Sequence, residues 1–122
     1  MADLEYSISD ERLSWPAKGQ SWEAVSGPFG NGALPVGEYL VKRNRVTSFT
    51  DAIGPSFRDP SGQGFFLPLE PQFKTTRSGF GIHPDGGVPG TLGCIGLKGG
   101  TKSFYDTLAG APFQDLTLEV KN

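Results

Sequence analysis

Glycine and proline recur so often along this chain that they divide it into short segments. The 122 residues include 18 glycines and 10 prolines, and both residue types interrupt helices and form turns. Several of the short segments between them alternate apolar and polar residues, as in residues 4–8 and 116–120. A period of two is typical of a strand with one buried face. We therefore expect a mainly β domain of short strands joined by turns.

Length and composition indicate one folded domain, which we assign to residues 1–122. A domain of this size buries roughly two-thirds of its unfolded surface, and a hydrophobic content of 36% argues against disorder. The formal net charge of −2 provides no field that would attract nucleic acid. No segment approaches the roughly 20 apolar residues of a membrane span. We therefore expect neither nucleic acid nor membrane insertion among its interactions.

The first third of the chain predicts a meander of strands. Residues 4–8 alternate up to a turn at Asp10-Glu11, and the alternation resumes at Leu13 and continues to Trp15. A second turn at residues 18–20 then leads into another alternating run. Consecutive short strands separated by tight turns usually pair with one another.

The middle of the chain is less regular. Tyr39–Val41 and Phe65–Leu67 are short apolar runs that predict buried strands. Between Arg43 and Pro71, prolines interrupt every other candidate element. We expect this stretch either to wall the functional site or to form an irregular surface segment.

One short helix is expected near residues 101–109. Thr101 has a side chain that can cap the first turn, and Gly110 is a typical stop residue. With this placement, Phe104, Tyr105 and Leu108 would face the core.

The stretch from Ser78 to Leu97 holds the only histidine and the only cysteine, His83 and Cys94. Apolar residues before His83 and after Cys94 indicate two strands, with turn-forming PDGG and PG between them. We expect a hairpin with a long loop that sets the two residues opposite each other, their Cβ atoms roughly 4.5–5.5 Å apart. An imidazole beside a thiol stabilises the thiolate or takes its proton, so the pair predicts a nucleophile and its base.

Other residues of this stretch suggest supporting roles. Gly93 has no side chain, so its amide and that of Cys94 can form an oxyanion hole. Asp85 can orient the imidazole, although a turn aspartate is the plainer interpretation and a backbone carbonyl can do the same task. Thr91 and Ser78 either hydrogen-bond a substrate or stabilise turns.

Structural roles are the alternative for both members of the pair. A lone cysteine is often a small buried hydrophobic residue, and a lone histidine can be a core residue. One cysteine and one histidine are too few for a structural zinc site. We expect no metal and no cofactor.

The segment Gly81-Ile82-His83, followed by Thr91-Leu92-Gly93-Cys94-Ile95-Gly96-Leu97, resembles the signature of the YkuD-type L,D-transpeptidases. That signature is an I-H strand followed by an S/T-H-G-C-I/V-R strand. The resemblance implies that Cys94 is the nucleophile and His83 the base.

Two upstream segments extend the resemblance. Residues 24–27 and 33–39 are similar to the SG…PxGxY pattern of a compact branch of the superfamily, so the likeness runs from about Leu13 to Leu97. This branch includes toxins delivered by type VI secretion. The resemblance implies a YkuD-like β-sandwich of short, mostly antiparallel strands with the one helix near residues 101–109.

Two positions depart from the family pattern. Leu92 stands where many members have a second histidine, and Gly96 stands where they have an arginine. If that arginine holds a substrate carboxylate, Arg77, Arg58 or Lys98 would have to replace it here. We assign Arg77 to substrate binding.

The resemblance implies a cysteine-dependent L,D-transpeptidase or L,D-carboxypeptidase that acts on peptidoglycan stem tetrapeptides through a thioester acyl-enzyme. Such an enzyme can serve as an antibacterial effector toxin. Two alternatives stay open. One is a non-catalytic β module that binds the cell wall or belongs to a phage or secretion apparatus. The other is a cysteine endopeptidase or amidase of peptidoglycan.

The amino-terminal segment MADLEYSISDERL lacks the basic and apolar regions of a signal peptide. We therefore expect synthesis in the cytoplasm and secretion by a route other than Sec, with action in the periplasm or cell wall. The expected partners are the peptidoglycan stem peptide and, for an effector, a cognate immunity protein.

Overall fold

The computed structural model describes residues 2–27, 33–45, 47–48, 65–75, 77, 79–84, 94–111 and 114–122. The strands in these ranges are β1 (Leu4–Ser7), β2 (Arg12–Trp15), β3 (Gln20–Val25), β4 (Gly37–Val41), β5 (Thr47–Ser48), β6 (Phe65–Pro71), β7 (Gly81–Pro84), β8 (Ile95–Leu97) and β9 (Leu116–Lys121). The helices are α1 (Thr101–Ala109) and the 3-10 turns η1 (Pro16–Lys18) and η2 (Arg43–Arg45). The prediction of a mainly β protein with one short helix near residues 101–109 is confirmed.

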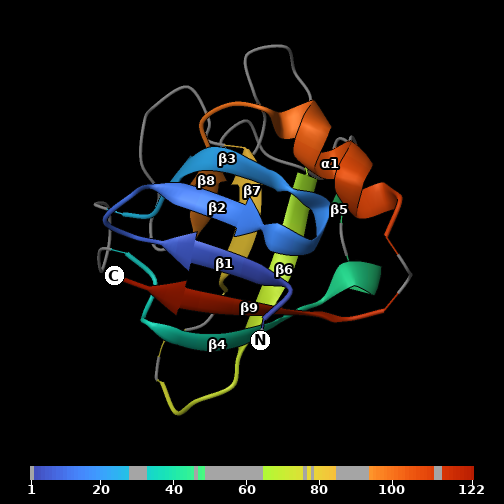
Figure 1. The fold of residues 1–122 in the computed structure, drawn as a ribbon. Coiled ribbons are helices and arrows are strands. Elements are labelled where there is room, and N and C mark those ends of the chain that lie inside the picture. The colour runs from blue at the N-terminus through green and yellow to red at the C-terminus, as the bar shows by residue number, and fades with distance from the viewer. Residues whose placement is uncertain are drawn as a thin grey trace.

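The strands form one sheet that closes into a barrel (Figure 1). Their order is β4-β9-β1-β2-β3-β8-β7-β6, and β4 pairs again with β6, so eight strands close the barrel and β5 attaches to β6. Most of the ladders are antiparallel, and the exceptions among the described strands are β1 with β9 and β7 with β8. The sandwich detail of the prediction is not confirmed, because the pairing of β4 with β6 joins the two ends of the ladder.

The predicted meander of β1, β2 and β3 is confirmed. Tyr6 pairs with Leu13, and Leu13 pairs in turn with Trp22, all three with buried side chains. Glu11 adopts a φ of 51° in the first turn. Gly19 adopts a φ of 64° in the second turn and donates its N–H to the carbonyl of Pro16. These left-handed positions let the chain reverse tightly.

The apolar run Phe65–Leu67 forms a strand as predicted, but this strand, β6, continues through the prolines that were expected to interrupt the chain. Pro68 and Pro71 both lie inside this strand, where they pair with Gly81 and Tyr39. Proline lacks an N–H donor but keeps its carbonyl acceptor. The Pro68 carbonyl accepts the N–H of Lys42 at 2.9 Å, so the strand continues through it.

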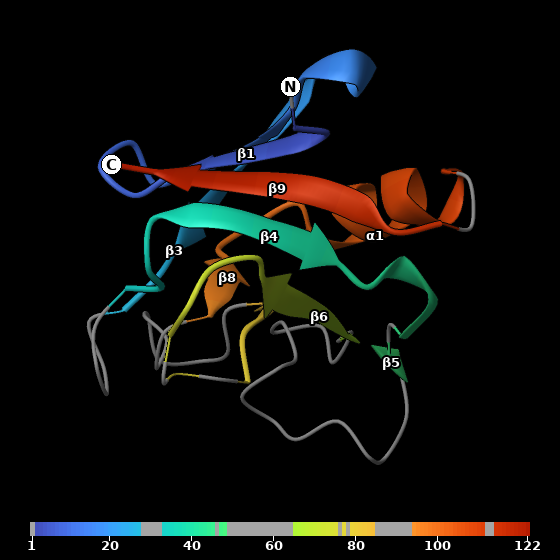
Figure 2. The same cartoon turned by 90° about the horizontal axis from the view of Figure 1, so that it is seen from below.

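Helix α1 packs against the end of the barrel where β3 and β6 begin (Figures 1 and 2). Phe104 lies edge-on to Trp22 at 5.0 Å between ring centroids and stacks on Phe65 at 5.8 Å. The Arg43 Nε donates to the Leu108 carbonyl at 3.0 Å, which ties η2 to the last turn of the helix. The helix therefore seals apolar side chains of this end of the barrel from water.

Thr101 does not cap this helix as predicted. It is the first helical residue and is buried, while Gly100 holds the N-cap position with a φ of 66°. A Cβ at Gly100 would also come within 2.7 Å of the Trp22 ring. Glycine is therefore required here both by the backbone conformation and by the close approach of the indole.

Candidate active site

His83 lies in β7 and Cys94 immediately precedes β8, and these two strands are neighbours in the barrel. They pair in parallel, with Ile82 opposite Ile95 and His83 opposite Gly96. The predicted hairpin is therefore wrong, because the two strands of a hairpin run antiparallel. The PDGG and PG residues that indicated a hairpin lie outside the described ranges.

The side chains of His83 and Cys94 belong to the outer face of the barrel. Ile82 and Ile95 are fully buried in the core, and alternation along a strand turns the neighbouring side chains to the other face. Extending the register by one residue places Cys94 level with Gly81, so Cys94 and His83 are diagonal neighbours. The two residues therefore share one face of the sheet, and the prediction that they stand directly opposite each other is wrong.

A backbone carbonyl fixes the orientation of His83. The Nδ1 atom lies 2.7 Å from the carbonyl oxygen of Pro84. A carbonyl can only accept, so Nδ1 carries the hydrogen and Nε2 keeps its lone pair. Burial lowers the pKa of His83 despite this hydrogen bond, so the ring is neutral at pH 7. The carbonyl of Pro84 therefore orients the ring, as one of the two predicted alternatives had it, and the other, Asp85, lies outside the described residues.

An aromatic ring from β6 packs against the imidazole. The rings of Phe66 and His83 are nearly parallel, with centroids 6.1 Å apart and an interplanar angle of 13°. The Phe66 ring also covers Gly81, where an added Cβ would overlap it. The missing side chain of Gly81 therefore creates the space that lets Phe66 lie beside His83.

Cys94 is partly exposed. Its Sγ donates to the carbonyl of Gly79 at 3.5 Å, and Gly79 adopts a φ of 77° as the chain enters β7. Burial raises the pKa of Cys94, while a backbone hydrogen bond from Gly81 and the charge of Arg77 lower it. The balance favours a neutral thiol, so its proton must leave during attack.

Of the predicted substrate-binding residues, Arg77 lies within the described ranges, and its role stays a prediction. Its charge acts on Cys94, and its main chain lies two residues before Gly79. The other predicted site residues, Ser78, Asp85, Thr91 and Gly93, lie outside the described residues, and their roles stay predictions.

Three site residues were not predicted from the sequence: Phe66, Gly79 and Gly81. The two glycines alternate with Phe80 and Ile82, a period-two pattern that leaves the outer face of β7 without side chains before His83. From this pattern the sequence could have predicted a strand face that carries no side chains before His83. Phe66 carried no such signal, because its position depends on the pairing of β6 with β7.

The pKa of Cys94 predicts how its alkylation depends on pH. We expect the rate with iodoacetamide to rise roughly tenfold per pH unit up to at least about pH 8.5, because only the thiolate reacts. A time course of labelling, quenched at fixed times and read by intact-protein mass spectrometry, measures this rate. Cys94→Ala is the blank, because the chain has one cysteine. A rate that is constant across neutral pH would indicate a preformed thiolate–imidazolium pair. It would contradict the inference that the Cys94 thiol and the His83 imidazole are both neutral.

Gly81→Ala is expected to displace Phe66 from His83. The overlap with the ring predicts a loss of about 1–3 kcal/mol in the free energy of unfolding, the usual range for overpacking. Adding Phe66→Ala should recover part of that loss, since the two changes couple through one contact. Gly99→Ala is the matched control, because nothing lies within 4 Å of its Cβ position. Equal effects of Gly81→Ala and Gly99→Ala in urea unfolding would contradict the contact.

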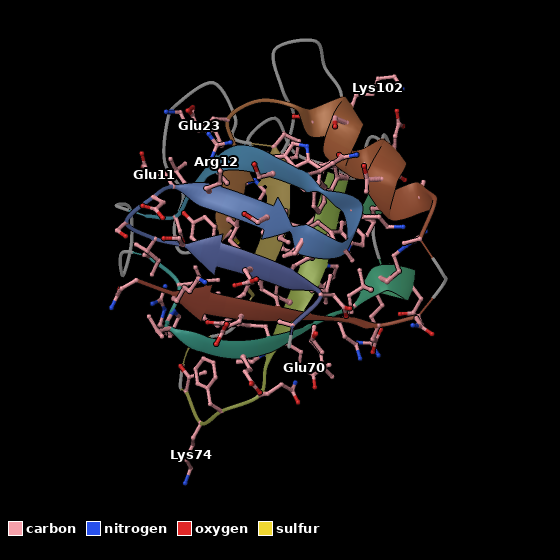
Figure 3. The ribbon with its side chains drawn as sticks, viewed as in Figure 1. Glu11, Arg12, Glu23, Glu70, Lys74 and Lys102 are labelled. Carbon is pink, nitrogen blue, oxygen red and sulfur yellow. The ribbon has the colours of Figure 1, made fainter. Side chains whose placement is uncertain are left out.

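A second surface feature lies on the opposite side of the barrel. An open polar groove runs along β1, β2 and β9, and its lining residues are Glu5, Ser7, Asp10, Arg12, Ser14, Pro16 and Lys121. Figure 3 shows Arg12 on this front side, whereas β7 and β8 lie behind it in Figure 1. The groove is separate from His83 and Cys94.

Within the described ranges, no three His, Cys, Asp or Glu side chains gather as metal ligands would. No helix in that part of the chain is both long and apolar enough to cross a bilayer. Neither a protein-family model nor a curated protein matches this chain.

Proposed function

We propose that the protein is a YkuD-like, cysteine-dependent L,D-transpeptidase or L,D-carboxypeptidase that acts on peptidoglycan stem tetrapeptides. The observation that supports it most is the pairing of β7 with β8, which sets two side chains on the same outer face: His83, oriented through Nδ1 by the Pro84 carbonyl, and the partly exposed Cys94. The resemblance of residues 81–83 and 91–97 to the family signature supplies the reaction class.

In the first half of the reaction, Cys94 takes the acyl group of the third residue of the stem peptide. Its sulfur attacks the carbonyl carbon while the thiol proton passes to Nε2 of His83. The tetrahedral intermediate then collapses, the carbon–nitrogen bond breaks, and the imidazolium returns the proton to the amine of the departing D-alanine. A thioester remains on Cys94.

The diagonal placement of Cys94 and His83 on one face suits this sequence of steps. In the proposed complex the scissile peptide unit lies across the two side chains. The substrate nitrogen then faces Nε2 while its carbonyl carbon faces the sulfur. Because both groups start neutral, no ion pair has to be separated before the proton moves.

The second half of the reaction decides the product. Water that attacks the thioester gives the tripeptide and free enzyme, which is L,D-carboxypeptidase activity. An amine from another stem peptide or a free D-amino acid gives a new peptide bond, which is L,D-transpeptidase activity. In both cases His83 takes a proton from the attacking group and returns one to the sulfur. The net change is hydrolysis or exchange of one peptide bond.

The biological setting belongs to the same proposal. An enzyme of this kind that reaches the cell wall of a competitor by a non-Sec route is an antibacterial effector, with a cognate immunity protein in the producing cell. The partial exposure of Cys94 favours catalysis over a purely structural cysteine, which would be expected to be fully buried.

Purified tetrapeptide muropeptides test the proposal. Mass spectrometry after incubation with the protein should show loss of the terminal D-alanine, or its exchange when a second D-amino acid is supplied. Cys94→Ala should show neither product. Loss of a different fragment would identify an endopeptidase or amidase instead. Absence of turnover with the unmodified protein, or unchanged turnover in Cys94→Ala, would contradict the proposal.

A further inference from the structure

Strand register sets an aromatic ring beside the imidazole of His83. Leu67 of β6 pairs with Ile82 of β7, and both side chains are buried in the core. One residue further along this antiparallel ladder, Phe66 stands level with His83, and alternation turns both side chains to the outer face. On its other side, His83 pairs with Gly96 of β8. The imidazole therefore has a ring on its β6 side and a residue without a side chain on its β8 side.

Two contacts in different directions hold the imidazole of His83. Its plane lies within 13° of the Phe66 ring, with centroids 6.1 Å apart, which is an offset-stacked arrangement. Its Nδ1 bonds to the Pro84 carbonyl at 2.7 Å. Because the N–H of an imidazole lies in the ring plane, this hydrogen bond alone lets the ring turn about the bond axis. A flat ring against one face opposes that turn, so the two contacts together fix the plane of the imidazole.

The ring of Phe66 is itself packed in place. It fills the space outside Gly81, where an added Cβ would overlap three of its carbon atoms. Phe66 is half-buried, whereas His83 is only 4% exposed. The Phe66 ring therefore covers one face of a histidine that has little contact with water.

Such a ring has two opposing effects on the charge of an imidazole. Apolar cover removes water and disfavours the imidazolium. The face of an aromatic ring attracts a cation that lies within about 6 Å of its centroid, and the 6.1 Å between Phe66 and His83 is at the limit of that range. Burial is the largest cause that acts on the pKa of His83, and it lowers that pKa. We therefore expect the loss of water to outweigh the attraction.

The strands next to His83 bring few titratable groups toward it. On β8 the titratable neighbour is Cys94, which lies on the diagonal. On β6 the charged residue is Glu70, which forms an ion pair with Lys42 at 4.0 Å. The two causes that act on the pKa of His83 are burial and the Pro84 carbonyl, and neither is a charged side chain.

We propose that Phe66 is a positioning residue for His83, whose ring fixes the plane of the imidazole and keeps water from one of its faces. The role in catalysis rests on the proposed function, whereas the contact does not. A base that is already oriented needs little reorganisation when a proton moves to it. Removal of the cover should raise the pKa of His83 toward about 6.5. The acid limb of kcat/KM, below which the base is protonated, would then move to higher pH.

Proton NMR of the imidazole tests the contact without any substrate. The chain has one histidine, so His83→Asn identifies its two ring C–H signals by their absence. Phe66→Leu keeps an apolar side chain without the flat ring, and should move these signals because the ring current is lost. Phe66→Ala removes the cover as well, and should raise the pH midpoint at which the signals titrate. A midpoint that stays unchanged or falls in Phe66→Ala would overturn the inference that the ring keeps water from His83.

Two further variants separate the contact from general effects on folding. Phe73→Leu is the matched control, because Phe73 is a partly buried ring that packs edge-on against Tyr39 of β4 at 5.3 Å. It should leave the imidazole signals and their midpoint unchanged. Gly81→Ala keeps the Phe66 ring but displaces it, and should raise the midpoint even if Phe66→Ala is too unstable to study. Signals unmoved in both Phe66→Leu and Gly81→Ala, or moved equally in Phe73→Leu, would overturn the inference.

Turnover distinguishes the positioning role from the proposed reaction. With a stem tetrapeptide, Phe66→Leu should lower kcat by up to roughly 100-fold, as displacement of a catalytic group does, with little change in KM. Phe66→Tyr restores a flat ring and should recover most of this loss, and Phe73→Leu should keep the kcat of the unmodified protein. Moved NMR signals with an unchanged kcat would overturn the positioning role and leave the proposed function standing. Moved signals without turnover by the unmodified protein would confirm the contact, contradict the proposed reaction and remove the role of Phe66 in it.

Discussion

His83→Asn is expected to lower the kcat of acyl transfer by about 10²–10⁴-fold, the usual contribution of a general base. The asparagine amide N–H can take the place of Nδ1–H and donate to the Pro84 carbonyl, which accepts at 2.7 Å from the histidine. Nothing in asparagine replaces Nε2. The variant therefore removes the base and keeps the structural hydrogen bond. Steady-state turnover of muropeptides, with far-ultraviolet circular dichroism as the check on folding, measures the effect.

The pH dependence of stability provides a control for His83→Asn. Burial lowers the pKa of His83 in the folded protein, whereas the unfolded histidine titrates near about 6.5. The unfolded state therefore binds more protons below that pH, and the folded state loses stability as the pH falls from about 6.5 through the lowered pKa. His83→Asn should lack this loss. The account would be contradicted if His83→Asn kept the kcat of the unmodified protein and also lost the same stability below about pH 6.5. The imidazole would then be neither buried nor catalytic.

Phe104→Ala is expected to destabilise the protein by about 3–5 kcal/mol, the range for deleting a buried aromatic ring. Phe104 is fully buried and joins α1 to Trp22 of β3 and Phe65 of β6. A domain of this size has a total stability of roughly 5–15 kcal/mol, so this change removes a large share of it. Chemical denaturation followed by tryptophan fluorescence reports the loss.

Lys102→Ala is the matched control on the same helix. Lys102 is exposed in the first turn of α1 (Figure 3), where it forms an ion pair with Asp106 at 2.7 Å. Exposed pairs at this spacing contribute about 0.3–0.5 kcal/mol. A loss in Phe104→Ala no larger than that in Lys102→Ala would mean that α1 does not seal the barrel.

Local patterns in the sequence predicted the elements that depend on near neighbours. The alternation around Tyr6, Leu13 and Trp22 is enough to define three strands, because tight turns make consecutive strands pair. Residues 101–109 were predicted as a helix because apolar residues recur at helical spacing before Gly110. The prediction that Thr101 caps this helix was wrong because the helix begins at Thr101 and the N-cap is Gly100. The indole of Trp22, which is distant in the sequence, leaves space only for glycine at position 100.

Pairing between distant segments could not be read from the sequence. The closure of the barrel depends on β4 meeting β6, and the parallel pairing of β7 with β8 reverses the direction that the turn-rich residues between them suggested. Both arrangements are set by how the apolar faces of all strands fill one core, which no local pattern contains. The prolines of β6 misled for a similar reason, because a carbonyl of proline still accepts a ladder hydrogen bond.

In the candidate site, too, residue identities could be predicted from the sequence, whereas their arrangement could not. His83 and Cys94 could be singled out because each is the only residue of its type, and their chemistry needs no knowledge of the fold. Their diagonal placement, the Pro84 carbonyl and the packing of Phe66 follow from strand register. The charge of Arg77 is visible in the sequence, whereas its contacts with Ala33 and Phe80 exist only in the folded chain.

The covalent intermediate tests the central claim most directly. Rapid acid quenching of the protein with a stem tetrapeptide, followed by peptide mapping, should find the acyl group as a thioester on the peptide that contains Cys94, with D-alanine released in equal amount. His83→Asn should slow the appearance of this adduct without moving it to another residue. Turnover without acylation of Cys94, or an adduct on a different side chain, would contradict the account.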